Sequence, residues 1–167
     1  MKKLYLVRHA KSSWKFPELD DFDRPLNKRG KRDAPMMGQR LRQQGIRPNL
    51  ILSSPAKRAK KVTQAIAEAL EVASSVVQYD RAIYDTSTEG LLTLLRSLDN
   101  RVTTLMLVGH NPELTDLANR LTTHYIDNVV TSGVVAITFN VEHWSEVRDN
   151  EGEFQWYDFP KSTQHDG

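Results

Sequence analysis

The most regular part of the chain is residues 102–121, which read VTTLMLVGHNPELTDLANRL. The apolar run Val102–Val108 shows no strict alternation, which is typical of a strand buried on both faces of a parallel sheet. A short turn, Gly109–Pro112, follows, and a helix is predicted over Glu113–Leu121. A buried strand that leads directly into a helix is the building unit of an α/β fold.

The same order of elements extends along the rest of the sequence. Strands are predicted at Leu4–Val7, Asn49–Leu52, Val76–Val77 and Val134–Val141, and helices at Lys28–Gln44, Pro55–Leu70 and from Thr86 to Leu98. Asp149–Gly152 suggests a hairpin. This alternation predicts a single-domain three-layer α/β/α sandwich with a mostly parallel central sheet. We expect the domain to cover residues 1–160 and a flexible tail to follow over residues 161–167.

Local signals predict how the helices begin. Pro35 lies inside the first helix, so we expect a kink or restart there, with Asp33 as a cap. Ser54-Pro55 is the sequence pattern of an N-cap followed by proline at the first helical position. Thr86 and Glu89 have the spacing of a capping box for the third helix.

Composition limits the class of protein. The 167 residues include 39% hydrophobic and 26% charged residues and no cysteine, which indicates a folded protein without disulfides. The N-terminus lacks the apolar core of a secretory signal, so we expect a cytoplasmic location without membrane association. A formal net charge of +2 does not favour nucleic acid as a partner. The basic clusters in 28–32 and 57–61 are interpreted as solvated helix faces, with Arg58 as the exception.

Three polar segments follow predicted strands: Arg8-His9, Ser53–Arg58 and Gly109-His110. Ligands of open α/β sheets bind outside the carboxyl ends of the strands, so we expect these segments to meet at one edge. Arginine matches phosphate oxygens with two parallel hydrogen bonds, and helix N-termini near Ser54 and Asn111 would add backbone donors. A neutral imidazole can accept a phosphoryl group covalently. The predicted edge therefore suits phosphoryl transfer.

Four segments in this order resemble one known family. They are Leu6–Ala10 (LVRHA), Asp23–Gly30 (DRPLNKRG), Ser53–Ala59 (SSPAKRA) and Val108–Pro112 (VGHNP). Together they resemble the histidine phosphatase (phosphoglycerate mutase-like) superfamily, and the short length resembles its phosphohistidine phosphatase SixA-like branch. The resemblance covers about residues 1–121.

The resemblance implies a role for each matching residue. His9 would be the nucleophile, Arg8 and Arg58 would hold the phosphoryl oxygens, and His110 would donate a hydrogen bond to the phosphoryl group. Arg24 is a further candidate for substrate binding. No metal or cofactor is implied. The expected partner is a phosphorylated protein or a small phosphorylated substrate, with phosphate as product.

Two questions stay open at the level of sequence. The general acid could be Asp85, Glu89 or no residue, because phosphohistidine has a leaving imidazole that does not require a strong acid. The leading hypothesis is a phosphatase that acts on phosphohistidine in a protein. The alternatives are a small-molecule phosphomonoesterase or mutase-like enzyme, and a phosphate-binding module without catalysis.

Overall fold

The computed structural model describes residues 1–9 and 20–162. Its strands are β1 (Lys2–Arg8), β2 (Leu50–Ser53), β3 (Val77–Tyr79), β4 (Thr104–Gly109), β5 (Val134–Phe139) and β6 (Glu153–Asp158). Its α-helices are α1 (Lys28–Gln43), α2 (Lys57–Leu70), α3 (Thr88–Arg96) and α4 (Glu113–Leu121). Single turns of 3-10 helix lie at η1 (Asp21–Asp23), η2 (Ser74–Val76), η3 (Arg81–Ile83) and η4 (Trp144–Glu146).

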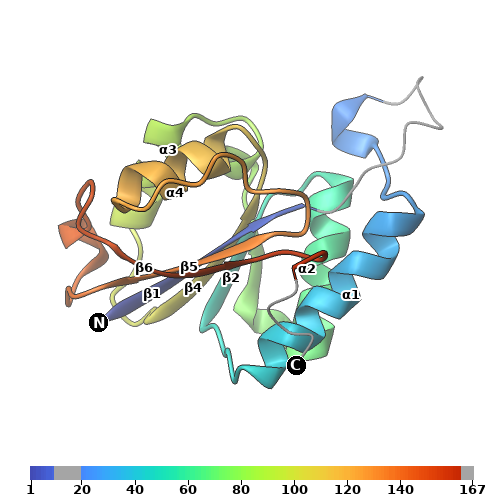
Figure 1. Cartoon of the computed structure of the whole chain (residues 1–167), viewed down its shortest axis with the longest axis horizontal. Helices are drawn as coiled ribbons and strands as arrows, with labels where there is room; N and C mark the ends of the chain where they lie inside the picture. Colours follow the sequence, from blue (N-terminus) through green and yellow to red (C-terminus); the bar gives the residue numbers. More distant parts are fainter. Residues whose placement is uncertain (10–19, 163–167) are drawn as a thin grey trace.

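The six strands form one sheet in the order β3-β2-β4-β1-β5-β6 (Figure 1). β1 pairs in parallel with β4, and β2 pairs in parallel with both β3 and β4. β5 is antiparallel to its neighbours β1 and β6. The predicted α/β class with a mostly parallel central sheet is therefore confirmed.

Helices cover both faces of the sheet, with α1 and α2 on one side and α3 and α4 on the other (Figure 1). The buried side chains form two clusters, one on each face of the sheet. One contains Leu95 and Leu117 from α3 and α4, and the other contains Met37 and Ile66 from α1 and α2. In β1, Leu4, Leu6 and Val7 are buried, but Tyr5 is only half-buried and Lys3 is exposed, so the predicted burial on both faces holds only for the C-terminal part of the strand.

Helix α1 is continuous, so the predicted restart at Pro35 with Asp33 as a cap is wrong. Asn27 is the N-cap, and its side chain accepts a hydrogen bond from the Gly30 N–H at 2.8 Å. Asp33 is buried within the helix. Packing of α1 against α2 stabilises the helix on both sides of the proline, which outweighs the local preference for a break.

The predicted starts of α2 and α3 are also wrong. α2 begins at Lys57, because the Ser54 hydroxyl accepts the N–H of Ala56 in the bend that precedes the helix, at 3.2 Å. In α3 the N-cap is Ser87, whose hydroxyl accepts the Gly90 N–H at 3.0 Å. Glu89, expected in a capping box, instead forms an ion pair with Arg120 of α4.

The C-terminal part adds the two antiparallel pairings. β6 begins after Gly152 as the hairpin signal suggested, but its partner β5 ends at Phe139, so the strand predicted just before Asp149 is wrong and η4 lies there instead. Of the predicted tail, residues 163–167 lie outside the described residues. Within the described ranges, the structure has no helix of the length and apolarity needed to cross a membrane.

Candidate active site

The carboxyl ends of β1 and β4 bring Arg8, His9 and His110 together. Arg8 is in register with Gly109, and the His9 N–H donates to the Gly109 carbonyl at 3.1 Å. The rings of His9 and His110 are 5.1 Å apart between centroids and inclined at 48°. The residues that follow these two neighbouring strands therefore lie side by side at the carboxyl ends of the strands, as predicted from the sequence.

Arg58 reaches the same place from the first turn of α2. Its side chain is buried, and its Nε donates to His9 Nε2 at 3.5 Å. Its Nη2 lies 3.5 Å from His110 Nδ1. Because Arg58 donates to His9 Nε2, this nitrogen carries a lone pair directed into the site. The guanidinium therefore links both histidines.

The terminal nitrogens of Arg58 also bind Asp21 of η1. Nη2 donates to Asp21 Oδ2 at 2.8 Å, and Nη1 donates to the Asp21 backbone carbonyl. Tyr84 donates its hydroxyl proton to the same carboxylate oxygen at 2.9 Å. Burial raises the pKa of the Asp21 carboxyl, but the hydrogen bonds from Arg58 and Tyr84 outweigh it and lower the pKa below its ordinary value. Asp21 is thus an ionised carboxylate on the arginine expected to bind phosphate.

His110 is a neutral member of the site. Burial, reinforced by the positive charge of Arg58, lowers the pKa of His110 to about 4. Its Nε2 lies 2.7 Å from Ser54 Oγ, and the ring of Tyr84 meets it edge-on with centroids 5.5 Å apart. The sequence analysis expected two histidines and two arginines to form a cationic pocket. In the structure the arginines carry the positive charge of the pocket, and His110 is an uncharged hydrogen-bonding group.

Arg8 is held by the segment that precedes β5. Its Nη1 donates to the Val129 carbonyl at 2.8 Å, and its Nε is buried without a hydrogen-bond partner among the described residues. Ser132, with φ of 63°, directs its N–H to the carbonyls of both Arg8 and His9 at 3.1 Å. Such a left-handed conformation is unfavourable for serine and is retained where the surroundings demand it. Here it anchors the end of β1.

Other predicted residues occupy different positions. Arg24 is buried at the C-terminal end of η1, next to the turn that carries Asp21. Glu89 is engaged by Arg120 on α4, and Asp85 is exposed. Among residues 1–9 and 20–162, no three or more His, Asp or Glu side chains gather in a group that could hold a metal ion.

Three residues of this region were not predicted from the sequence: Asp21, Tyr84 and Ser132. Asp21 lies two residues before the DRPL motif, so its nearness to Arg24 was the available signal. Tyr84 and Ser132 stand outside the matching segments, and no local pattern distinguishes them. Their positions depend on η3 and on the turn before β5, which only the folded chain brings to the site.

Comparison with known proteins identifies the family. The sequence model of the histidine phosphatase superfamily (branch 1) matches residues 4–84. A protein of Agrobacterium tumefaciens assigned as the phosphohistidine phosphatase SixA has a crystal structure with a TM-score of 0.82 to this chain, 28% identity, and coverage of 95% of this chain and 98% of that one. The chain belongs to the histidine phosphatase superfamily.

Two further comparisons bear on this histidine phosphatase. The protein histidine phosphatase SixA complexed with tungstate shares the fold, with a TM-score of 0.81, 20% identity, and coverage of 95% of this chain and 97% of that one. An uncharacterized chloroplastic protein of Arabidopsis thaliana is 34% identical over 128 residues, which are 72% of this chain. The chain spans 59% of the length of that relative.

Substitutions of Arg58 and of its neighbour Lys57 should have different effects on catalytic activity. Arg58→Ala removes the guanidinium that contacts both His9 and His110, so kcat/KM for a small aryl phosphate should fall about a hundredfold or more. Lys57→Ala is the matched control, because it removes a cation one residue away and should leave kcat/KM for the aryl phosphate nearly unchanged. Equal losses in the two variants would contradict the assignment of Arg58.

Asp21→Asn should strengthen binding of inorganic phosphate. The amide retains the size of the carboxylate but removes the negative charge that occupies Arg58, so the inhibition constant for phosphate should fall about tenfold, equivalent to about 1.4 kcal/mol. Asp23→Asn on the same turn is the control and should leave inhibition unchanged. Weaker inhibition of Asp21→Asn would show that Asp21 positions Arg58 and does not compete with the anion.

Proposed function

We propose that this cytoplasmic phosphatase removes the phosphoryl group from phosphohistidine in a partner protein, through a phosphorylated His9. The observation that carries the proposal is the placement of His9 Nε2 at 3.5 Å from Arg58 Nε, beside the neutral ring of His110. A nucleophilic nitrogen, cationic donors and an uncharged donor at one point are what in-line phosphoryl transfer needs. Membership of the superfamily supports the same reaction.

In the first step, the lone pair of His9 Nε2 attacks phosphorus as the bond from phosphorus to the substrate imidazole breaks. The electron pair of that bond stays on the leaving imidazole, which takes up a proton from solvent water and leaves as neutral histidine. Arg58 exchanges its contact with His9 for the phosphoryl oxygens, and Arg8 contributes a second guanidinium. Both charges stabilise the equatorial oxygens in the transition state.

In the second step, water attacks phosphorus, the bond to His9 Nε2 breaks, and phosphate leaves. The ring nitrogen recovers its lone pair, so the enzyme is regenerated. His110 assists both steps as a neutral donor. When Ser54, whose Oγ lies 2.7 Å from Nε2, donates its hydroxyl proton there, Nδ1 carries the ring proton and can donate it to a phosphoryl oxygen.

The proposed substrate follows from the carboxylates around the site. Asp21 is ionised and bound to Arg58, so it holds no proton for an alkoxide leaving group, and Glu89 is engaged by Arg120 of α4. A phosphoramidate releases imidazole, which can be protonated without such an acid. The resemblance in fold to SixA phosphatases supports a protein phosphohistidine as the substrate.

His9→Ala should abolish turnover, because it removes the proposed phosphoryl acceptor. Incubation with a radiolabelled phosphoryl donor should label the wild-type protein with an acid-labile group, and this label should be absent from His9→Ala. His124→Ala is the control, since this histidine is exposed and its ring stacks on Phe154, which is not a residue of the site. Turnover of His9→Ala within tenfold of the wild type would refute the nucleophile.

A panel of three substrates should test the leaving group. We expect kcat/KM to be highest for a phosphohistidine peptide, intermediate for an aryl phosphate and lowest for an alkyl phosphate. Asp85→Asn and Glu89→Gln should leave hydrolysis of the peptide nearly unchanged. If either variant lost about a hundredfold, the scale of general acid catalysis, that carboxylate would be the acid and the small-molecule phosphomonoesterase would be the better hypothesis.

A further inference from the structure

Basic residues crowd the N-terminal halves of α1 and α2. They are Lys28, Arg29, Lys31 and Arg32 on α1 and Lys57, Lys60 and Lys61 on α2. Neither helix has an acidic residue in its first turn. Cations at a helix N-terminus oppose the helix dipole, at a cost of about 0.3–1 kcal/mol each. The other two helices follow the ordinary preference, since Glu89 opens α3 and Glu113 opens α4.

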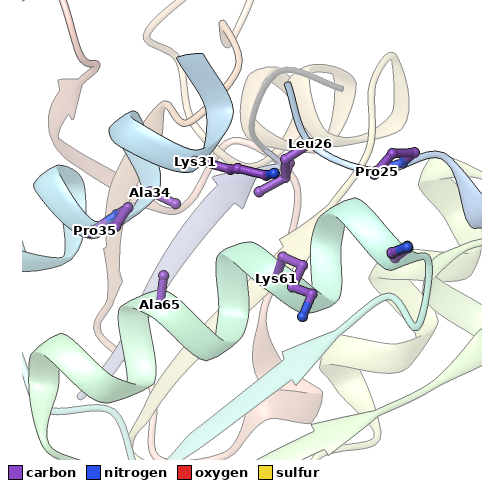
Figure 2. A pocket seen from close by; sticks show the side chains of 8 residues that line it. Pro25, Leu26, Lys31, Ala34, Pro35, Lys61 and Ala65 are labelled. Carbon is purple, nitrogen blue, oxygen red and sulfur yellow. The ribbon is translucent and has the colours of Figure 1, made fainter. Parts of the chain in front are cut away.

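A cavity of about 500 Å³ separates these two basic helix faces. Figure 2 shows the side chains that line it, which come from α1, from α2 and from the segment that leads into α1. They are Pro25, Leu26, Lys31, Ala34, Pro35, Lys57, Lys61 and Ala65. We call this cavity the lysine groove. Leu26 and Ala34 are buried and give it an apolar floor, whereas its three lysines are exposed.

The positive charge of the groove comes from its three lysines. Among the residues that the structure describes, Lys31, Lys57 and Lys61 form no ion pair. The acidic side chain of α1 nearest in sequence, Asp33, is buried and lies 3.5 Å from Arg32. Three cations around an apolar floor therefore remain available to a ligand that brings both negative charge and an apolar group.

The groove begins at the edge of the sheet that carries the site. α2 starts there after β2, and α1 starts a few residues after η1, whose Asp21 contacts Arg58. Lys57 precedes Arg58, and Pro25 follows Arg24. Lys57, Lys61 and Ala65 lie on successive turns of α2, so the groove extends about 12 Å along this helix. A chain that presents a phosphorylated side chain to His9 could reach it with the residues next in sequence.

We propose that the lysine groove binds an acidic segment of the phosphoprotein substrate, with an apolar side chain of that segment on Leu26 and Ala34. The inference rests on the proposed function and specifies which protein substrates the enzyme selects. A polypeptide is favoured over nucleic acid because the groove has an apolar floor and no aromatic side chain among its lining residues. Charge complementarity at such a site raises the association rate and the specificity.

The test compares two peptides with the same central phosphohistidine. In one peptide Glu-Leu-Glu flanks it on both sides, and in the other Gln-Leu-Gln does. Phosphoimidazole serves as the small substrate. The wild-type protein should hydrolyse the acidic peptide with about tenfold higher kcat/KM than the neutral peptide, because its KM for the acidic peptide is lower. Raised salt should reduce this preference. The double variant Lys31→Glu/Lys61→Glu should lose the preference and retain turnover of phosphoimidazole within about twofold.

The matched control is Arg47→Glu/Arg148→Glu. It makes the same change in net charge in two exposed loops at the opposite edge of the sheet, and it should keep the preference. Equal hydrolysis of the two peptides by the wild type, or a loss in the control as large as in the groove variant, would overturn the proposal. So would competition by a single-stranded oligonucleotide that exceeds competition by the unphosphorylated acidic peptide.

The outcomes also separate this inference from the proposed function. If the wild type hydrolyses phosphoimidazole and both peptides at equal rates, the phosphatase assignment stands and the groove assignment fails. If none of the three phosphoramidates is hydrolysed, the proposed function itself is wrong.

Discussion

The site depends on the parallel pairing of β1 with β4 more than on any other contact. This pairing sets Arg8 opposite Gly109, so the residues that follow the two strands, His9 and His110, emerge next to each other. A shift by one residue would reverse the face of every side chain on one strand. The register is determined because β4 is buried along nearly its whole length and Leu4, Leu6 and Val7 of β1 are buried in the core. The constraint that stabilises the core therefore also positions the histidines.

Arg58 is the residue through which the parts of the site are joined. Its three nitrogens contact His9, His110 and Asp21, which come from β1, from the end of β4 and from η1. Before phosphate arrives, the carboxylate of Asp21 satisfies the charge of a buried guanidinium that would otherwise be costly to desolvate. In the proposed reaction a phosphoryl group replaces that contact. The affinity for phosphate would then depend on how much better Arg58 binds phosphate than the Asp21 carboxylate, and this competition would favour release of the product.

A basic surface around α1 and α2 adjoins the residues of the proposed active site. The sequence analysis interpreted the lysines as a solvated face, since clusters of this kind usually are. The structure adds two facts that composition does not contain. The lysines of two separate helices surround one cavity, and they lie at the end of the helices where positive charge is least stable. The lysine groove and the site then share the edge from which a protein substrate would approach.

Sequence by itself determined the α/β class and the segments from which the site is built. Runs such as Leu105–Val108 have one stable environment, a strand covered on both faces, and the chain must then place Arg8, His9, Arg58 and His110 near one edge. The start of each helix was less determined. Ser54, Thr86 and Glu89 had cap-like spacing. In the folded protein Ser54 contacts His110, Glu89 pairs with Arg120, and Ser87 takes the place of Thr86 as the N-cap of α3.

Tertiary structure alone decided which carboxylate reaches the site and which charges remain. Asp21, Tyr84 and Ser132 come from turns whose positions depend on packing against distant elements, and no local pattern encodes that distance. The neutral state of His110 likewise follows from burial beside Arg58, a property of the folded environment and not of the residue type. Sequence thus specified the chemical groups, whereas the fold assigned their partners and their protonation.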